Sequence, residues 1–219
     1  MRTRSLVRVS RSMDSAETSM NTVFSSRDIQ VIDDFLTVSE KAEISRVCAG
    51  PIWRYGWPID STPFARPCWH SFIAGSRRNE YESCEEELLE DERWGFLSGF
   101  WGRVQNRYLP TATLLGVYAN GQSFDQDSPI HRDNLPDEPG QTVIVFGNEH
   151  WATSWGGELV FYENAKTDVV ASVLPEPGRI VIFNGQMPHS ARSPAIGCDR
   201  LRVHEMSGRV EIFVGVVDN

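Results

Sequence analysis

Two apolar stretches, TLLGVY (residues 113–118) and TVIVF (residues 142–146), decide the fold of this chain, and the motif His131-Arg132-Asp133 lies between them. Short runs that are rich in β-branched and aromatic residues and bounded by turn residues are typical of β-strands. Three similar runs follow before the C-terminus: Glu158–Tyr162, Arg179–Phe183 and Arg209–Val217. Strands at this spacing predict an antiparallel sandwich or barrel.

The part of the chain before these strands carries helix signals. Thr37 and Glu40 have the spacing of a capping box, and Gly50-Pro51 predicts the end of the helix that they begin. A second helix is predicted from about Glu85 to Tyr108, because apolar residues recur there at helical spacing. We therefore expect a mainly β fold of the α+β class, in which N-terminal helices support one sheet.

The length of 219 residues fits one domain with a sizeable core. Residues 1–27 are rich in Arg and Ser and poor in apolar residues, so we expect a flexible N-terminal segment there. Residues 28–219 are then a single domain, since no internal repeat or second domain is recognisable. The sequence sets no oligomeric state.

Charge and cysteine content exclude several classes of protein. A formal net charge of −9 argues against nucleic acid or an anionic membrane surface as a partner, and no apolar run is long enough to span a membrane. Acidic residues concentrate between Glu80 and Glu92, where we expect a solvated helix start. The four cysteines form no CxxC pair, which favours reduced thiols and a cytoplasmic location.

The motif His131-Arg132-Asp133 and the more distant His189 are the candidate metal ligands. Side chains two apart on an extended segment point the same way, so His131 and Asp133 share a face. Two imidazoles and one carboxylate suit a ferrous ion and leave coordination positions open. Alone, a histidine and an aspartate two apart occur often by chance, and His189 could equally cap a strand.

The order of motifs along the chain carries more information than any one of them. Tyr118-Ala-Asn-Gly121 precedes the histidine–aspartate motif, Trp155-Gly-Gly-Glu-Leu159 follows it, and Pro188-His189 comes after the Arg179–Phe183 run. This order resembles the Fe(II)/2-oxoglutarate-dependent dioxygenases of the prolyl-4-hydroxylase-like type. The resemblance covers the chain from about Val31 to the C-terminus and is strongest from Thr113 onward.

The resemblance implies a double-stranded β-helix, or jelly roll, with the metal inside one mouth of the barrel. It implies Fe(II) held by His131, Asp133 and His189, with 2-oxoglutarate as co-substrate and O₂ as oxidant. The reaction implied is hydroxylation of an unactivated C–H bond, with release of succinate and CO₂. Related halogenases have a small residue where Asp133 stands, so this aspartate favours an oxygenase.

The resemblance also suggests residues for 2-oxoglutarate. Its distal carboxylate needs a cation, and arginine can donate two parallel hydrogen bonds to it. Arg209 begins the predicted strand after His189 and matches the family's position, although the spacing is longer than usual; Arg200 and Arg202 are the alternatives. Tyr118 matches a tyrosine that contacts the co-substrate in some relatives. Phe146 replaces a second such tyrosine, so Thr142 is the candidate for the missing hydrogen bond.

Candidates for substrate contact come from the aromatic stretch before the barrel and from polar residues beside the metal motif. They are Trp53, Tyr55, Trp69, Asn120 and Asn134. We expect Trp57 and Phe72, from the same aromatic stretch, to belong to the core.

The chain size and the lack of a recognisable protein-docking domain favour a small-molecule substrate. Two alternatives stay open: a hydroxylase of a protein residue such as proline, and a catalytically silent jelly-roll binding module. A cupin-type enzyme is disfavoured, because cupins use several histidines and a glutamate.

Overall fold

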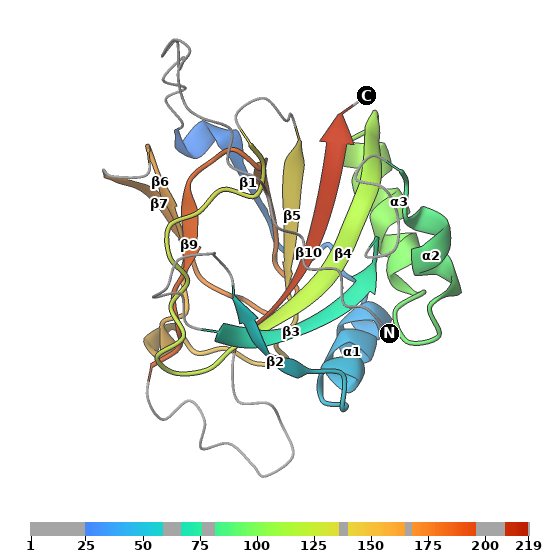
Figure 1. Cartoon of the computed structure of the whole chain (residues 1–219), viewed down its shortest axis with the longest axis horizontal. Coiled ribbons are helices and arrows are strands. Elements are labelled where there is room, and N and C mark those ends of the chain that lie inside the picture. The colour runs from blue at the N-terminus through green and yellow to red at the C-terminus, as the bar shows by residue number, and fades with distance from the viewer. Residues whose placement is uncertain are drawn as a thin grey trace, which may run out of the picture.

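Two antiparallel sheets face each other in the computed structural model, which describes residues 25–58, 67–75, 82–135, 140–164 and 168–195 and the backbone of residues 209–218 (Figure 1). The large sheet contains, in spatial order, β1 (Ile29–Ile32), β8 (Ile180–Asn184), β5 (Gln141–Phe146), β10 (Arg209–Asp218), β4 (Ala112–Gln122), β3 (Pro67–Ala74) and β2 (Arg54–Pro58). The small sheet contains β7 (Val169–Val173), β6 (Leu159–Tyr162) and β9 (His189–Ala191). The predicted jelly roll is confirmed.

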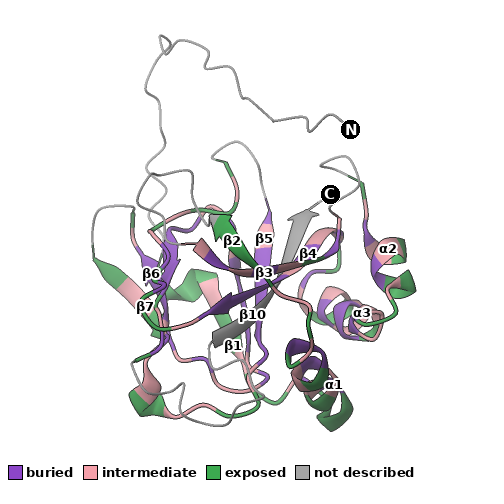
Figure 2. Ribbon diagram, turned by 60° about the horizontal axis from the view of Figure 1, so that its bottom comes forward, coloured by how far each residue is buried: buried purple, intermediate pink, exposed green. Residues whose placement is uncertain are grey.

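Three helices, α1 (Val38–Cys48), α2 (Glu85–Glu90) and α3 (Leu97–Tyr108), pack on one face of the large sheet (Figures 1 and 2). We call this the outer face. Its core combines helix residues such as Phe100 and Val104 with strand residues such as Val143 and Val145. The predicted helices on one sheet are therefore present.

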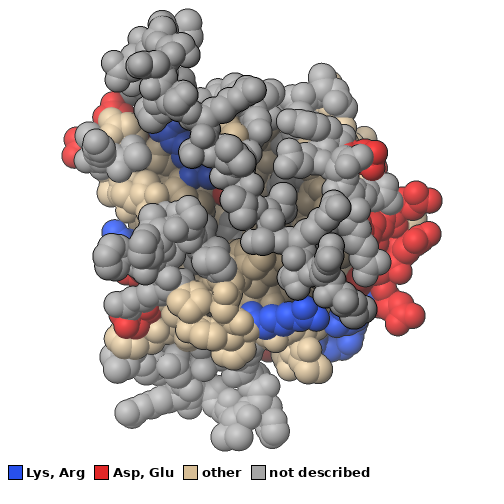
Figure 3. All heavy atoms as spheres, in the orientation of Figure 1, with Lys and Arg blue, Asp and Glu red and all other residues tan. Residues whose placement is uncertain are grey.

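The predicted helix Glu85–Tyr108 is wrong in one respect, because the structure breaks it into α2 and α3. The Asp91 carboxylate accepts hydrogen bonds from the backbone N–H groups of Arg93 and Trp94, which turns the chain out of the helix. Acidic side chains gather at the right of Figure 3, on the side where Figure 1 places α2; of the three in the first turn of α2, Glu86 is exposed, whereas Glu85 and Glu87 are half-buried and accept hydrogen bonds.

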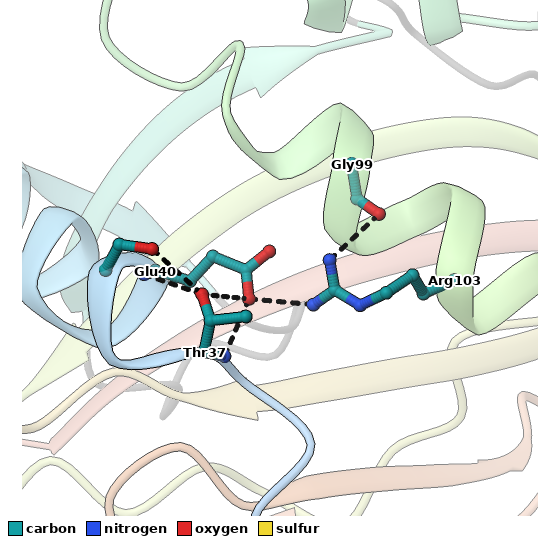
Figure 4. Close-up of polar contacts among 5 residues, drawn as sticks. Thr37, Glu40, Gly99 and Arg103 are labelled. Carbon is teal, nitrogen blue, oxygen red and sulfur yellow. Dashed lines mark hydrogen bonds and ion pairs between the residues drawn. The ribbon is translucent and has the colours of Figure 1, made fainter.

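The start of α1 is fixed by the predicted capping box (Figure 4). Thr37 Oγ1 accepts from the Glu40 N–H, and the Glu40 carboxylate accepts from the Thr37 N–H at 2.8 Å. The same Glu40 Oε2 accepts a hydrogen bond from Arg103 Nη2 at 2.7 Å, which ties α1 to α3. Gly50 follows the C-cap residue Ala49, so the predicted end of α1 is confirmed.

A second core fills the space between the two sheets, on what we call the inner face. Strand β5 shows the division: Val143 and Val145 belong to the outer core, whereas Ile144 and Phe146 belong to the inner core. Successive side chains of a strand point to opposite faces, so a strand buried on both sides reads as a continuous apolar run. The inner core ends at His189, whose ring contacts the ring of Phe183.

Several elements were not predicted. Strands β2, β3 and β9 lie in stretches without a clear apolar run, whereas β7 is a short apolar run that the sequence analysis did not assign. His189 is the first residue of β9. The expectation that Trp57 and Phe72 belong to the core is wrong: they are 41% and 51% exposed. Their strands lie at the edge of the large sheet, beyond the part that the small sheet covers.

Near the N-terminus, Ser26–Asp28 form one short 3-10 turn before β1, whereas most of the predicted flexible segment, residues 1–24, lies outside the described residues. Three of the cysteines, Cys48, Cys68 and Cys84, are buried and form no disulfide with one another. No helix among the described residues has the length and hydropathy needed to cross a membrane.

Candidate metal centre

His131, Asp133 and His189 converge at one end of the inner core. One candidate ligand atom from each lies within 4.8 Å of the other two. His131 Nε2 lies 3.8 Å from Asp133 Oδ1, and His189 Nε2 lies 3.7 Å from Asp133 Oδ2. The three residues that the sequence selected are therefore close enough to share one cation.

Backbone hydrogen bonds hold the histidine–aspartate motif against the segment that carries His189. The His131 N–H donates to the His189 carbonyl at 2.9 Å, and the His189 N–H donates to the His131 carbonyl at 3.0 Å. The N–H groups of Asp133 and Asn134 both donate to the Gly185 carbonyl. The two segments are 58 residues apart from His131 to His189 in the chain, yet paired backbone bonds fix their relative position.

Gly185 leaves room for the side chain of Asn134. A Cβ at position 185 would overlap the side-chain amide of Asn134. A larger residue would therefore require this side chain, which follows the metal motif, to move. Asn134, a predicted substrate contact, packs against this glycine.

Both histidine rings are oriented by backbone carbonyls. His131 Nδ1 lies 3.0 Å from the Pro129 oxygen, and His189 Nδ1 lies 2.9 Å from the Met187 oxygen. A carbonyl oxygen only accepts, so each Nδ1 carries the proton and each Nε2 keeps its lone pair. This arrangement is the one that histidine metal ligands use, with the remote nitrogen donating to the protein.

Asp133 is oriented by Thr142. The Thr142 hydroxyl donates to Asp133 Oδ2 at 2.6 Å. Oδ1 of this carboxylate faces His131 and Oδ2 faces His189. Thr142 was predicted to contact 2-oxoglutarate; in this structure its hydroxyl binds the aspartate.

The donor set fits a ferrous ion. Two neutral imidazoles and a carboxylate gather on one side, as in the three-ligand sites of non-haem iron oxygenases, and leave other positions for exogenous ligands. His189 is only 1% exposed and its ring contacts those of Phe161 and Phe183, so one side of the site is dry and apolar. His131 and Asp133 close the other side, toward the mouth.

The residues predicted for 2-oxoglutarate lie on neighbouring strands. Tyr118 on β4 packs against the inner core, and Arg209 begins β10, as predicted, with its backbone opposite Gln122. Arg200 and Arg202 lie outside the described residues.

The aromatic substrate candidates do not meet the metal ligands. Trp53 packs against the outer core, and its Nε1 donates to the Cys48 carbonyl. Tyr55 and Trp69 form a ring pair with centroids 5.0 Å apart. Trp69 alternates with His70 along β3, so this pair lies on the face away from His70 and Tyr118.

His70 is the residue that sequence reasoning undervalued. It is buried on the inner face of β3, where Nδ1 lies 2.6 Å from the side-chain oxygen of Asn120, a predicted substrate contact. Burial lowers the pKa of His70, although the hydrogen bond to Asn120 opposes this shift, so the ring is neutral at pH 7. Strand alternation is the sequence signal that could have identified His70. It places Cys68, His70 and Phe72 on one face of the strand and Trp69 and Ser71 on the other.

Comparison with known proteins supports the assignment of the centre. The family model described as the 2OG-Fe(II) oxygenase superfamily matches residues 115–205, a stretch that contains all three candidate ligands. No curated protein sequence matches the chain.

Solved structures share the fold at low sequence identity. A prolyl hydroxylase from Trichoplax adhaerens, in complex with a hypoxia inducible factor peptide fragment, has a TM-score of 0.57 and 18% identity over 88% of this chain and 84% of its own. A 2OG-Fe(II) oxygenase family protein from Burkholderia pseudomallei has a TM-score of 0.59 and 15% identity, over 88% and 86%. The α-ketoglutarate-dependent epimerase SnoN from nogalamycin biosynthesis has a TM-score of 0.57 and 13% identity, over 87% and 78%.

Proposed function

We propose that this chain is a member of the 2OG-Fe(II) oxygenase superfamily, whose model matches residues 115–205, and that it hydroxylates an unactivated C–H bond of a small-molecule substrate. The reaction consumes 2-oxoglutarate and O₂ and releases succinate and CO₂. The observation that carries the proposal is the convergence of His131, Asp133 and His189 within 4.8 Å, with the two Nδ1 atoms directed to backbone carbonyls.

In this proposal His131 Nε2, His189 Nε2 and one oxygen of Asp133 hold Fe(II). When bound, the iron supplies the oxidising chemistry with O₂ and 2-oxoglutarate. Thr142 fixes the Asp133 carboxylate, and Pro129 and Met187 fix the two rings through their carbonyl oxygens. Phe161 and Phe183 exclude water from the His189 side.

We assign the distal carboxylate of 2-oxoglutarate to Arg209, with Tyr118 as a further contact. Tyr118 borders the inner core, and the backbone of Arg209 pairs with β4 in the row of Gln122. Gln122 and Tyr118 are four residues apart and therefore share a face of β4. A guanidinium in that row would bring a positive charge to a largely apolar interior, where it binds a carboxylate strongly.

The choice of a small-molecule substrate is supported by the chain itself. The described residues form one pair of sheets with three supporting helices and no added docking module. Proteins of similar fold include one bound to a peptide fragment and one from a natural-product pathway, so the fold serves both substrate classes. Hydroxylation of a residue in a peptide is the second candidate.

The proposal is tested by anaerobic titration of the protein with Fe(II) and 2-oxoglutarate. A visible charge-transfer band at one equivalent of each is expected, and it should be absent in Asp133→Ala. Succinate release is then screened with small metabolites and, in parallel, with proline-containing peptides. A silent binding module would give no band, and stimulation by peptides alone would transfer the assignment to the second candidate.

A further inference from the structure

The large sheet extends past the small sheet, and its last two strands carry exposed aromatic rings on the inner face. In Figure 1, β6, β7 and β9 lie at the left of the barrel, while β2 and β3 cross its lower front. Phe72 pairs with Tyr118 and His70 pairs with Asn120, so both face the barrel interior. Trp57 stacks on His70, and we call Trp57, His70 and Phe72 the aromatic wall.

The three rings of the wall contact one another and still leave apolar surface open. The Trp57 and His70 rings are parallel within 11° at 4.3 Å, and Phe72 meets each of them edge to face. Yet Trp57 and Phe72 are 41% and 51% exposed. Neighbouring exposed aromatic rings beside a buried site commonly mark a ligand-binding surface.

His70 supplies the second observation, because it is a buried polar group in need of a ligand. The ring is 4% exposed. Its Nδ1 donates to the Asn120 oxygen, since an amide oxygen only accepts, so Nε2 is left as an acceptor. Nε2 has no hydrogen-bond partner in the part of the chain that the structure describes. Buried polar atoms normally have one, so the missing donor is a candidate ligand group.

We propose that the aromatic wall is the substrate-recognition surface and that it selects a flat apolar ring carrying an O–H or N–H donor. The ring packs against Trp57 and Phe72, and the donor hydrogen-bonds to His70 Nε2. This inference rests on the proposed function, whose substrate class it narrows.

His70 Nε2 is buried, so a ligand reaches it only when a neighbouring side chain moves. Trp57, which stacks on the His70 ring, is suited to this movement. It lies on the edge strand β2, next to a bulge at Gly56, which has a φ of 109° and open space around it.

The donor requirement separates the two substrate classes left open above. A prolyl residue offers an apolar ring but no N–H or O–H of its own, because its amide nitrogen is bonded to three carbon atoms. It would leave His70 Nε2 without a partner. A phenol or an indole offers both the ring and the donor.

The test uses ¹⁵N-histidine NMR on the Zn(II)-loaded protein with 2-oxoglutarate, since Zn(II) is diamagnetic. The chain has five histidines, and a His70→Gln variant assigns the His70 signals. Phenol is expected to shift the Nε2 resonance of His70 in the direction of an accepted hydrogen bond. Toluene, which has the ring without the donor, should leave it in place. An equal response to both probes, or none to phenol, overturns the proposal.

Affinity measurements supply the matched control. Trp57→Ala should weaken phenol binding about tenfold, the scale of a lost aromatic contact. Tyr55→Ala removes an exposed ring from the same strand but from the opposite face, and should change phenol affinity less than about twofold. Equal effects of the two variants, or saturable binding of an acetylated tri-proline peptide that matches phenol, would contradict the assignment.

The Fe(II) and 2-oxoglutarate absorption band is recorded for every variant. Its presence without a phenol effect on His70 overturns only the aromatic wall. Its absence from the wild-type protein overturns the proposed function itself.

Discussion

The two faces of the large sheet use the same strands but treat their polar groups differently. On the outer face, the charged and indole groups tie the helices to one another: Arg103 donates to Glu40, and the Trp101 indole N–H donates to Glu85. On the inner face, imidazole Nε2 atoms are acceptors directed toward positions that a metal or a ligand can occupy. These outer-face pairs join elements of the fold, whereas the inner-face Nε2 atoms are the groups that we propose bind the metal and the substrate.

From this contrast we expect the largest loss of activity when a proposed metal ligand is substituted. Asp133→Ala and His131→Ala should lower succinate production below detection, because two remaining ligands hold Fe(II) weakly. Thermal unfolding should change little, since the backbone bonds between residues 131 and 189 remain. Activity assays and circular dichroism melts measure the two effects.

The matched control is Glu149→Ala. Glu149 and His150 form another histidine–carboxylate pair at 3.8 Å, but on the exposed surface. Turnover should be unchanged in this variant. Full activity in Asp133→Ala would remove the metal assignment.

A smaller effect is expected at the co-substrate. Arg209→Ala should raise the KM for 2-oxoglutarate by about a hundredfold, the scale of two lost charge-assisted hydrogen bonds, and Arg209→Lys should recover only part of it. Arg200→Ala should have a much weaker effect. Steady-state kinetics at saturating iron decide between them, and the reverse ranking would show that the cation is Arg200.

Substitutions of Thr142 distinguish two roles for its hydroxyl: orienting the metal ligand Asp133, or contacting the co-substrate directly. Thr142→Val removes the donor to Asp133 and should lower Fe(II) affinity about tenfold, with kcat restored at high iron. Thr142→Ser keeps the hydroxyl and should behave like wild type. A raised KM for 2-oxoglutarate with unchanged iron affinity would instead support the original expectation for Thr142.

The sequence was sufficient to select three inner-face residues that lie close together, because its signal is an order of motifs. His131 and Asp133 lie between two apolar runs and His189 comes after a third, and the structure pairs the backbones of His131 and His189. The contact between Thr142 and Asp133 could not be predicted in the same way. Strand alternation places Thr142 on a face, but only packing decides what its hydroxyl reaches.

The aromatic stretch shows why counting residues along the sequence could not predict which side chains lie on which face of β2. Tyr55 and Trp57 are two residues apart and would share a face of a regular strand. A register shift between them pairs Tyr55 with Trp69 and Trp57 with Cys68, so the two rings lie on opposite faces. Gly56 allows this bulge through its positive φ. One inserted residue therefore places two rings that counting would put together on opposite faces of the sheet.

The smallest effect is expected on the outer face, and it concerns stability alone. Hydrogen bonds from Arg103 and Thr37 lower the pKa of Glu40 below its ordinary value of 4.5, against desolvation, the largest single contribution, which raises it. Glu40 therefore stabilises the fold above pH 4.5, and this contribution is lost as the pH falls through its folded-state pKa. Glu40→Gln should cost about 1 kcal/mol at pH 7 and less at pH 3.5.

Urea unfolding at the two pH values measures this difference. Glu43→Gln is the control, because Glu43 pairs with Arg46 on the exposed side of the same helix and should contribute less than about 0.5 kcal/mol. Neither variant should alter the Fe(II) and 2-oxoglutarate band, since Glu40 belongs to the outer face. A change in iron affinity in Glu40→Gln would show that the two faces of the sheet are coupled, because the variant removes no inner-face group.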